Sequence, residues 1–350
     1  MLEATPLQAR QILADNIRAD LVTFMKGPPS TAKSAMTASL ADEYNMLLID
    51  YRLAQCDPTD LLGFPQVDPV TGRARYAPME TFPLEGDELP INPKTGKQYS
   101  GWLLFLDEFN SAGKEVQKAA YKLLLDRMVG MFRLHPNVRI VCAGNREEDG
   151  ALVEEMSTAL QSRMCHLRLR PDHASFMGHI RSEEWDHRII SFLEFKPSLV
   201  YTFDPDKAEV EMTYGCYRTW EFIHKQLKNI PDVDTKENLL LLFSSAIGEG
   251  IAREFITYLK NFAKLPQIRD IISHPASARI PKEPGQLYAL SGAIGVNADK
   301  TTISSLVQYT LRMAKEYQVI TLRNVLKNDM SLMSEPALEK WAEENHKELQ

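Results

Sequence analysis

The sequence predicts an α/β fold, a parallel sheet sandwiched by helices, followed by a mainly α-helical region. Two observations predict it. Over residues 20–53 a short apolar strand, a glycine-containing loop, a helix and a second strand follow one another. Beyond about Pro171 the apolar residues recur instead at helical spacing, as in "YRTWEFIHKQLKNI". We therefore predict an α/β domain over residues 1–170 and, over 171–350, an α-helical lid with a C-terminal helical extension.

Composition bounds the class of protein. The 350 residues are 44% hydrophobic and 25% charged, which is typical of a globular chain of two domains. A net charge of −7 disfavours nucleic acid as a partner. The four cysteines form no C-x-x-C pair, so we expect buried thiols and no zinc site. The first residues lack an apolar core and no apolar run would span a bilayer, which predicts a cytoplasmic protein without a membrane segment.

The elements of the first domain follow from local patterns. Thr5, Pro6 and Gln8 have the spacing of a helix N-terminus with a capping box. The segment "VDPVTGRARYAP", within about residues 60–80, predicts a hairpin that turns at Thr71 and Gly72. Apolar runs predict strands at 20–26, 45–53, 101–107 and 137–145, and a short helix with a last strand within 157–171. Helical composition marks 33–44 and 113–128.

The loop after the first strand is close to a phosphate-binding pattern. It reads "GPPSTAKS", and G-x-x-x-x-G-K-[ST] would be matched by Gly27, Lys33 and Ser34. Backbone N–H groups at the start of a helix form an anion cradle, in which Lys33 would reach the β- and γ-phosphates and Ser34 would hold Mg²⁺. Ser30 and Ala32 stand where glycine is common, and a plain strand–turn–helix explains the stretch equally well. The candidate nucleotide contacts are Gly27, Pro28, Pro29, Ser30, Thr31, Ala32, Lys33 and Ser34.

Two acids follow the third predicted strand. "LLFLDEF" delivers Asp107 and Glu108 to the carboxyl end of a buried strand, which is where α/β sheets bind ligands. Asp107 suits a Mg²⁺ shell and Glu108 suits activation of a water that attacks the γ-phosphate. A solvated acidic end of a strand is the alternative. The order of loop and acids along the chain favours a nucleotide site.

Three further residues complete the candidate site. Asn145 ends the strand "RIVCAGN", where it would hold the attacking water against Glu108, although such an Asn is also a common turn former. Arg163 in "LQSRMCHL" lies between a short helix and a strand and faces outward. Arg218 in "YRTWEFI" starts a helix of the second domain. For either arginine alone, a surface salt bridge is the alternative.

Taken together, these stretches resemble the AAA+ ATPases, and within them the MoxR-like branch that carries an insert in helix 2. The resemblance covers roughly residues 20–225, and the most telling stretch is "DLLG" followed by the glycine-turn hairpin. It implies that Lys33 and Ser34 belong to Walker A, Asp107 and Glu108 to Walker B, and that Asn145 is sensor 1. It also implies that Arg163 is an arginine finger and Arg218 is sensor 2. A ring, commonly a hexamer, with ATP and Mg²⁺ between subunits follows from the same resemblance.

Three functions compete at this point. The leading one is a ring that hydrolyses ATP to remodel or activate a partner, in this family often a separate protein with a von Willebrand factor A domain. The hairpin with Arg73 and Arg75 is the candidate partner contact, or equally a surface loop. The second is a nucleotide-gated scaffold with little turnover, which Ser30 and Ala32 favour. The third is a nucleic-acid motor, against which the acidic charge counts.

Overall fold

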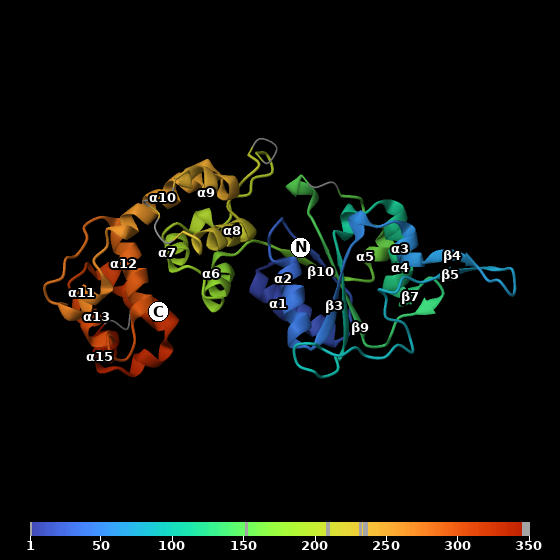
Figure 1. Cartoon of the computed structure of the whole chain (residues 1–350), viewed down its shortest axis with the longest axis horizontal. Coiled ribbons are helices and arrows are strands. Elements are labelled where there is room, and N and C mark those ends of the chain that lie inside the picture. Colours follow the sequence, from blue (N-terminus) through green and yellow to red (C-terminus); the bar gives the residue numbers. More distant parts are fainter. Residues whose placement is uncertain (1, 151–152, 208–210, 231–232, 234–236, 345–350) are drawn as a thin grey trace. The chain divides into compact units, whose positions relative to one another are not determined.

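The computed structural model describes residues 2–150, 153–207, 211–230, 233 and 237–344 (Figure 1). The chain divides into two compact units. One comprises Met1–Ser175 with Asp204–Asp206, and the other comprises Phe176–Phe203 with Lys207–Gln350. The first unit is α/β and the second is helical.

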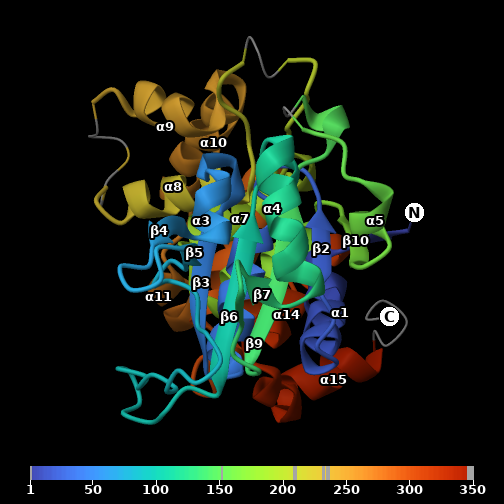
Figure 2. The ribbon, with the colours of Figure 1, turned by 90° about the vertical axis from the view of Figure 1, so that its right-hand side faces the viewer.

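The first unit is organised by one parallel sheet. Figure 2 shows its central strands side by side, with α4 in front of them. Every neighbouring pair is parallel, as the alternation of strands and helices predicts. Within the described residues the strands stand in the order β1 (Glu3–Ala4), β10 (Cys165–Leu169), β2 (Thr23–Lys26), β9 (Val138–Gly144), β6 (Gly101–Asp107) and β3 (Met46–Arg52).

Helices cover both faces of this sheet. Helices α1 (Pro6–Arg18) and α2 (Lys33–Glu43) pack on the face that carries Leu103 and Phe105 of β6. Helices α3 (Pro58–Leu62) and α4 (Lys114–Leu125) pack on the face that carries Leu104 and Leu106. Because both faces are buried, β6 is apolar along its whole length and only Asp107 at its end is polar.

The first helix begins as its sequence predicts. The Thr5 side chain accepts a hydrogen bond from the Gln8 N–H at 3.3 Å, and the Gln8 side chain accepts one from the Thr5 N–H at 3.0 Å. Pro6 occupies the first helical position, where a backbone N–H would have no acceptor within the helix, so its absence costs nothing. The predicted capping box is therefore confirmed.

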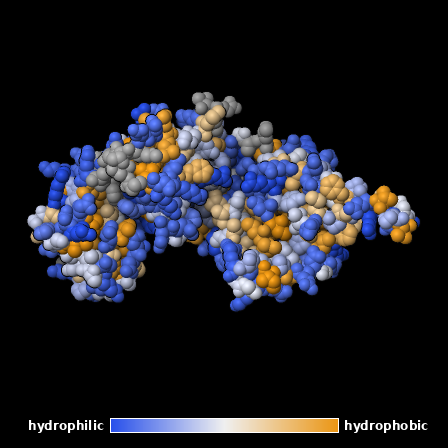
Figure 3. All heavy atoms as spheres, in the orientation of Figure 1, coloured by the Kyte–Doolittle hydropathy of each residue, from blue (hydrophilic) through white to orange (hydrophobic). Residues whose placement is uncertain are grey.

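Two hairpins extend from this unit. The predicted one consists of β4 (Phe64–Val67) and β5 (Ala74–Ala77), and it lies between α3 and β6. A second one, β7 (Met128–Val129) with β8 (Phe132–Arg133), follows α4 and was not predicted. Figure 3 shows hydrophobic atoms at the projecting tip of the first hairpin. Short turns elsewhere in the unit are η1 (Leu53–Gln55), η2 (Phe109–Ser111), η3 (Glu147–Asp149) and α5 (Thr158–Gln161).

The second unit is helical throughout its described part. Its elements are α6 (His173–Ser182), which begins just before the division, α7 (His187–Phe195), η4 (Pro197–Leu199), α8 (Tyr217–Leu227), α9 (Leu239–Ile247), α10 (Glu249–Ala263), α11 (Ile268–Ser273), α12 (Pro284–Asn297), α13 (Ile303–Thr310), α14 (Lys315–Asn328), η5 (Met330–Ser334) and α15 (Pro336–Glu344).

Details of the helical part differ from the sequence-based expectation. The apolar stretch after residue 236 forms two helices because the chain turns at Gly248, and the stretch from residue 303 is likewise two helices. The terminal stretch "SEPALEKWAEENHKELQ" is rich in charged residues and its sequence predicts a solvated helix, a prediction that was wrong. Leu338 and Trp341 of α15 are 0% and 2% exposed and belong to the core of the unit, so one face of this helix is buried. Residues 345–350 of that prediction lie outside the described part.

Two other expectations concern the cysteines and the membrane. All four cysteines are free. Cys142 and Cys216 are buried, but Cys56 and Cys165 are only half-buried, which corrects the expectation of four buried thiols. No helix in the described part of the chain has the length and apolar character needed to cross a membrane.

Candidate nucleotide-binding site

The loop at residues 27–34 connects β2 directly to α2. Gly27 lies close to β10: a Cβ at this position would stand 2.9 Å from the Leu169 Cβ, so only glycine fits without a shift. The Thr31 hydroxyl donates to the Pro28 carbonyl at 2.8 Å, which ties the loop to itself. The N-cap of α2 is Ala32, which has no side chain with which to cap the helix, so its first N–H groups can meet an anion.

Ser30 and Ala32 have a left-handed backbone. Their φ angles are +57° and +64°, in the region that glycine adopts at little cost. These are the two positions where the nucleotide pattern commonly has glycine. The loop therefore keeps glycine-like turns with non-glycine residues, which costs of the order of 1 kcal/mol at each.

Lys33 folds back over the loop. Its ammonium donates to the carbonyls of Gly27 at 2.8 Å and Pro28 at 3.1 Å. A half-buried ammonium at the first turn of a helix adds its charge to the positive end of the helix dipole. To contact a phosphate, the Lys33 side chain would exchange these carbonyls for phosphate oxygens.

Ser34 and Asp107 meet at the carboxyl edge of the sheet. The Ser34 hydroxyl donates to Asp107 Oδ2 at 3.0 Å, and the other oxygen, Oδ1, accepts the Glu108 N–H at 2.8 Å. Burial, and then the negative charge of Asp107, raise the pKa of the neighbouring Asp50 carboxyl. A hydroxyl beside a carboxylate is an oxygen donor set of the kind that Mg²⁺ prefers.

Glu108 and Asn145 follow neighbouring strands. Glu108 also has a left-handed backbone, with φ +54°, and it begins the turn η2. Asn145 directly follows β9, which lies between β2 and β6. The ends of β2 and β9 are joined where the Gly27 N–H donates to the Gly144 carbonyl at 3.4 Å. The structure thus brings Lys33, Ser34, Asp107, Glu108 and Asn145 to one edge of the sheet.

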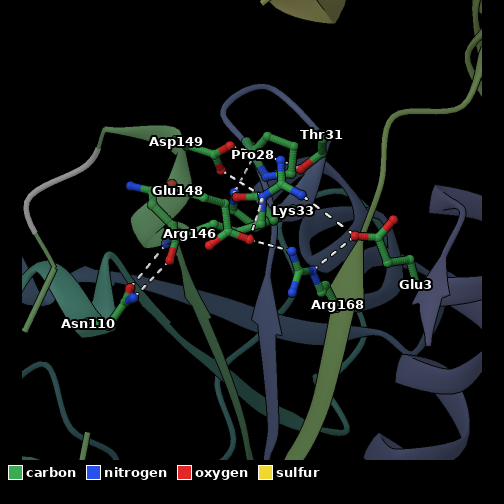
Figure 4. A network of polar contacts seen from close by, with 11 residues as sticks. Glu3, Pro28, Thr31, Lys33, Asn110, Arg146, Glu148, Asp149 and Arg168 are labelled. Carbon is green, nitrogen blue, oxygen red and sulfur yellow. Dashed lines mark hydrogen bonds and ion pairs between the residues drawn. The ribbon is translucent and has the colours of Figure 1, made fainter. Parts of the chain in front are cut away.

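Two connections at this edge were missed by sequence reasoning. The first is Asn110, whose buried side chain bonds the backbone of Asn145. The second is an ion-pair network beside the loop, in which Arg146 pairs with Asp149 through two bonds of 2.8 Å and Arg168 pairs with Glu3 at 3.0 Å and with Glu148 (Figure 4). Asp149 raises the pKa of Arg146. "DEFN" contained Asn110, but nothing in the sequence indicated its partner.

Arg163 lies in the turn between α5 and β10, as predicted. It is exposed, and its guanidinium donates to the Ala159 carbonyl at 2.9 Å and to the Ser162 hydroxyl at 3.3 Å. The guanidinium carbon is 5.8 Å from the centroid of the Tyr121 ring on α4. The side chain is therefore held against the end of α5 and is exposed to solvent.

Arg218 begins α8 of the second unit, as predicted, and is exposed. It belongs to a different unit from the loop, so its assignment to the site depends on the sequence alone.

A cavity of about 890 Å³ opens beside the edge of the sheet that carries these groups. Its lining includes Lys26, Asn110, His166 and Arg168, but none of the described residues of the loop at 27–34. The N-terminus of α2, Lys33 and the Ser34–Asp107 pair converge at the loop, so the candidate site is the loop and not this cavity.

A strand–loop–helix with a lysine and a serine, beside an acidic strand end in a parallel sheet, is the layout of a phosphate-loop nucleotide-binding domain. Comparison with protein families agrees with this class. Residues 22–164 match the family described as AAA domain (dynein-related subfamily), so this part of the chain is similar to an AAA domain.

Solved structures were also compared with the chain, and two of those that match are as follows. A candidate ATPase from Cytophaga hutchinsonii ATCC 33406 has 11% identity and a TM-score of 0.33, covering 100% of this chain and 91% of the other. A point mutant of RuvB from Thermotoga maritima has 17% identity and a TM-score of 0.33, covering 97% and 89%. Comparison with curated protein sequences gives no match.

Proposed function

We propose that the chain is an ATPase of the MoxR-like AAA+ branch, which hydrolyses Mg·ATP to remodel or activate a partner protein. The observation that carries the ATPase proposal is the 3.0 Å contact between Ser34 and Asp107. It joins the end of the phosphate loop to the acidic end of β6, so the two side chains suited to Mg²⁺ are already adjacent.

The residues present fit a Mg²⁺ ion. Ser34 and Asp107 would bind it through a hydroxyl and a carboxylate, and the ion would neutralise charge on the phosphates. Among the described residues no group of three or more His, Cys, Asp and Glu side chains could hold a metal. Two protein ligands supplemented by phosphate oxygens and water are the usual arrangement for this ion.

The other residues supply positioning and proton transfer. Lys33 would bind the β- and γ-phosphates, and the N–H groups of the loop would bind the phosphate oxygens. The Glu108 carboxylate would accept a proton from the attacking water, which Asn145 would orient. Because β9 lies between β2 and β6, Asn145 at its end would lie within reach of both the phosphates and the attacking water.

The proposal includes a site shared between subunits. Arg163 is exposed, and its guanidinium bonds Ala159 and Ser162 at the end of α5. A residue that completes the site of a neighbouring subunit has to lie on the surface, and Arg163 does. The assembly would be a ring, in this family commonly a hexamer, and Arg218 would act as sensor 2.

The two hairpins are the proposed contact with a separate partner, in this family often one with a von Willebrand factor A domain. They pack together, because a Cβ on Gly130 would lie 3.6 Å from the Tyr76 Cβ. Their large hydrophobic side chains are exposed, from 40% at Phe132 to 91% at Val70. Exposed apolar groups gathered at one place mark interaction surfaces. The exposed hydrophobic residues of the two hairpins are Phe64, Val67, Val70, Tyr76, Met131 and Phe132.

The test is steady-state release of phosphate from Mg·ATP by the wild type and by Glu108→Gln, over a range of protein concentrations. We expect turnover that rises cooperatively with concentration and is lost in Glu108→Gln, with ATP still bound. Turnover retained by Glu108→Gln would contradict the role of Glu108.

A nucleotide-gated scaffold is the second candidate. The left-handed backbone of the non-glycine residues Ser30 and Ala32 favours it, because strain in the loop opposes the rearrangements of a turnover cycle. In that case the wild type would bind ATP and assemble without releasing phosphate.

A further inference from the structure

Asn110 is buried at the edge of the sheet that carries the candidate site. Its side chain is 4% exposed and comes from the turn η2, two residues after Glu108. A buried amide normally needs partners for both its oxygen and its nitrogen. Asn110 finds both of them on a single residue.

That residue is Asn145, 35 positions further along the chain. Asn110 Nδ2 donates to the Asn145 carbonyl at 2.8 Å, and Asn110 Oδ1 accepts the Asn145 N–H at 3.1 Å. Such a pair fixes both position and orientation of the peptide that follows β9. Figure 4 shows the two bonds reaching from Asn110 to this backbone.

Gly144 lies in close contact with the Asn110 side chain. A Cβ at position 144 would lie 2.0 Å from Asn110 Oδ1 and 2.9 Å from the Phe24 ring. Only glycine lets the Asn110 amide approach this closely. The glycine in "AGN" therefore serves the contact between the two turns.

Asn110 also contacts the segment that leads to Arg163. Its main-chain carbonyl accepts the Glu154 N–H at 2.7 Å, just before the helix α5. Asn110, which belongs to the turn that begins at Glu108, thus bonds both the backbone of Asn145 and the approach to Arg163. Each of these carries a residue with an assigned role in the proposed reaction.

We propose that Asn110 is a positioning residue, which holds Asn145 against the Glu108 turn and transmits a shift of either one to the segment before Arg163. This inference rests on the proposed ATPase function. In this proposal Asn110 contacts neither the nucleotide nor the attacking water, and it acts through Asn145 and Glu108. The proposal concerns the orientation of Asn145, so it predicts an effect on turnover and not on ATP affinity.

The test uses Asn110→Asp in the full chain. This substitution keeps the size and the acceptor for the Asn145 N–H, but it places an oxygen against the Asn145 carbonyl. Gln117→Glu is the matched control, because Gln117 is a buried amide of α4 that donates to the Ala112 carbonyl at 3.1 Å and is not bonded to Asn145. Asn110→Ser, which is shorter and uncharged, is the second variant if the carboxylate prevents folding.

The first readout is hydrogen exchange at the Asn145 and Glu154 amides, which needs no turnover. We expect exchange at Asn145 to accelerate about 10-fold or more in Asn110→Asp, with a smaller increase at Glu154 and neither change in Gln117→Glu. Unchanged exchange at Asn145 in both Asn110 variants would overturn the proposal. So would equal increases in the Gln117→Glu control.

The second readout separates kcat from KM. We expect kcat for ATP to fall about 100-fold in Asn110→Asp with KM within about threefold, since misplacing a catalytic group acts on the chemical step. A loss of affinity without loss of kcat would overturn the proposal. If the wild type itself releases no phosphate, the ATPase function fails, and the exchange readout still decides whether Asn110 positions Asn145.

Discussion

The Ser34 hydroxyl donates a 3.0 Å hydrogen bond to the carboxylate of Asp107, across 73 residues of sequence. Ser34 lies in the first turn of α2, and Asp107 is the last residue of β6. The contact forms because α2 packs over β6, on the face that carries Leu103 and Phe105. It joins the phosphate loop to the acidic strand end.

This pair predicts a change in the magnesium requirement. In Ser34→Ala the Mg²⁺ concentration that supports half-maximal ATP binding should rise about 10-fold, because one of two protein oxygens is lost. Ser39→Ala is the control, since Ser39 lies on the same helix but further from its N-terminus, and its hydroxyl is not bonded to Asp107. Binding of a fluorescent ATP analogue during a Mg²⁺ titration measures the effect. An unchanged Mg²⁺ requirement would remove Ser34 from the metal site.

The left-handed backbone at Ala32 predicts a stabilising substitution. Ala32→Gly should raise the free energy of unfolding by about 1 kcal/mol, because glycine adopts φ +64° without steric cost. Ala35→Gly, in the right-handed first turn of α2, should lower it by about 0.5–1 kcal/mol. Urea unfolding of both variants measures the difference in sign. If both substitutions destabilise the protein, the loop does not have the backbone seen here.

The exposed position of Arg163 predicts complementation between subunits. Arg163→Ala should keep the wild-type unfolding midpoint, because its bonds go to Ala159 and Ser162 beside it, and should lose turnover. Lys33→Ala should lose ATP affinity. Mixed in equal amounts, the two variants should regain part of the phosphate release, since intact loops then meet intact arginines. A mixture as inactive as its components, with assembly confirmed, would argue against a shared site.

His224 of α8 predicts a pH dependence for the second unit. It is 6% exposed, its Nδ1 accepts the Asp186 N–H at 3.1 Å, and its ring stacks on Trp185. Burial, and then the charge of Lys228, lower the pKa of His224. Its unfolded form therefore takes up a proton first, and stability falls as the pH drops below about 6.5.

Thermal unfolding between pH 7.5 and 5.5 measures this effect. The wild type should lose stability over this range, and His224→Gln, which cannot titrate, should lose less. His187 lies near the same turn, and burial lowers its pKa too, so His187→Gln should also flatten the profile. The charged groups Asp186 and Glu221 oppose the shift at His224 without reversing it. A profile as steep in both variants as in the wild type would contradict the assignment.

Much of the fold could be predicted because its signals are local. The helix start at Thr5 depends on residues within one turn, and strands such as β6 show themselves as unbroken apolar runs. The second hairpin, β7 with β8, was missed because two-residue strands carry almost no pattern. The buried face of α15 was missed because its charged residues outnumber its two buried core residues, Leu338 and Trp341.

The sequence by itself determined the candidate site residues: the lysine and serine of the loop, the two acids at the end of β6 and the asparagine after β9. Each of these stands at the end of an element whose local pattern is strong. The tertiary structure decided which of them touch. Strand order brings Ser34 to Asp107 and Asn110 to Asn145, and packing admits only glycine at position 144. Such contacts join positions distant in the chain, and their free energy depends on the geometry of the whole sheet, so no local pattern encodes them.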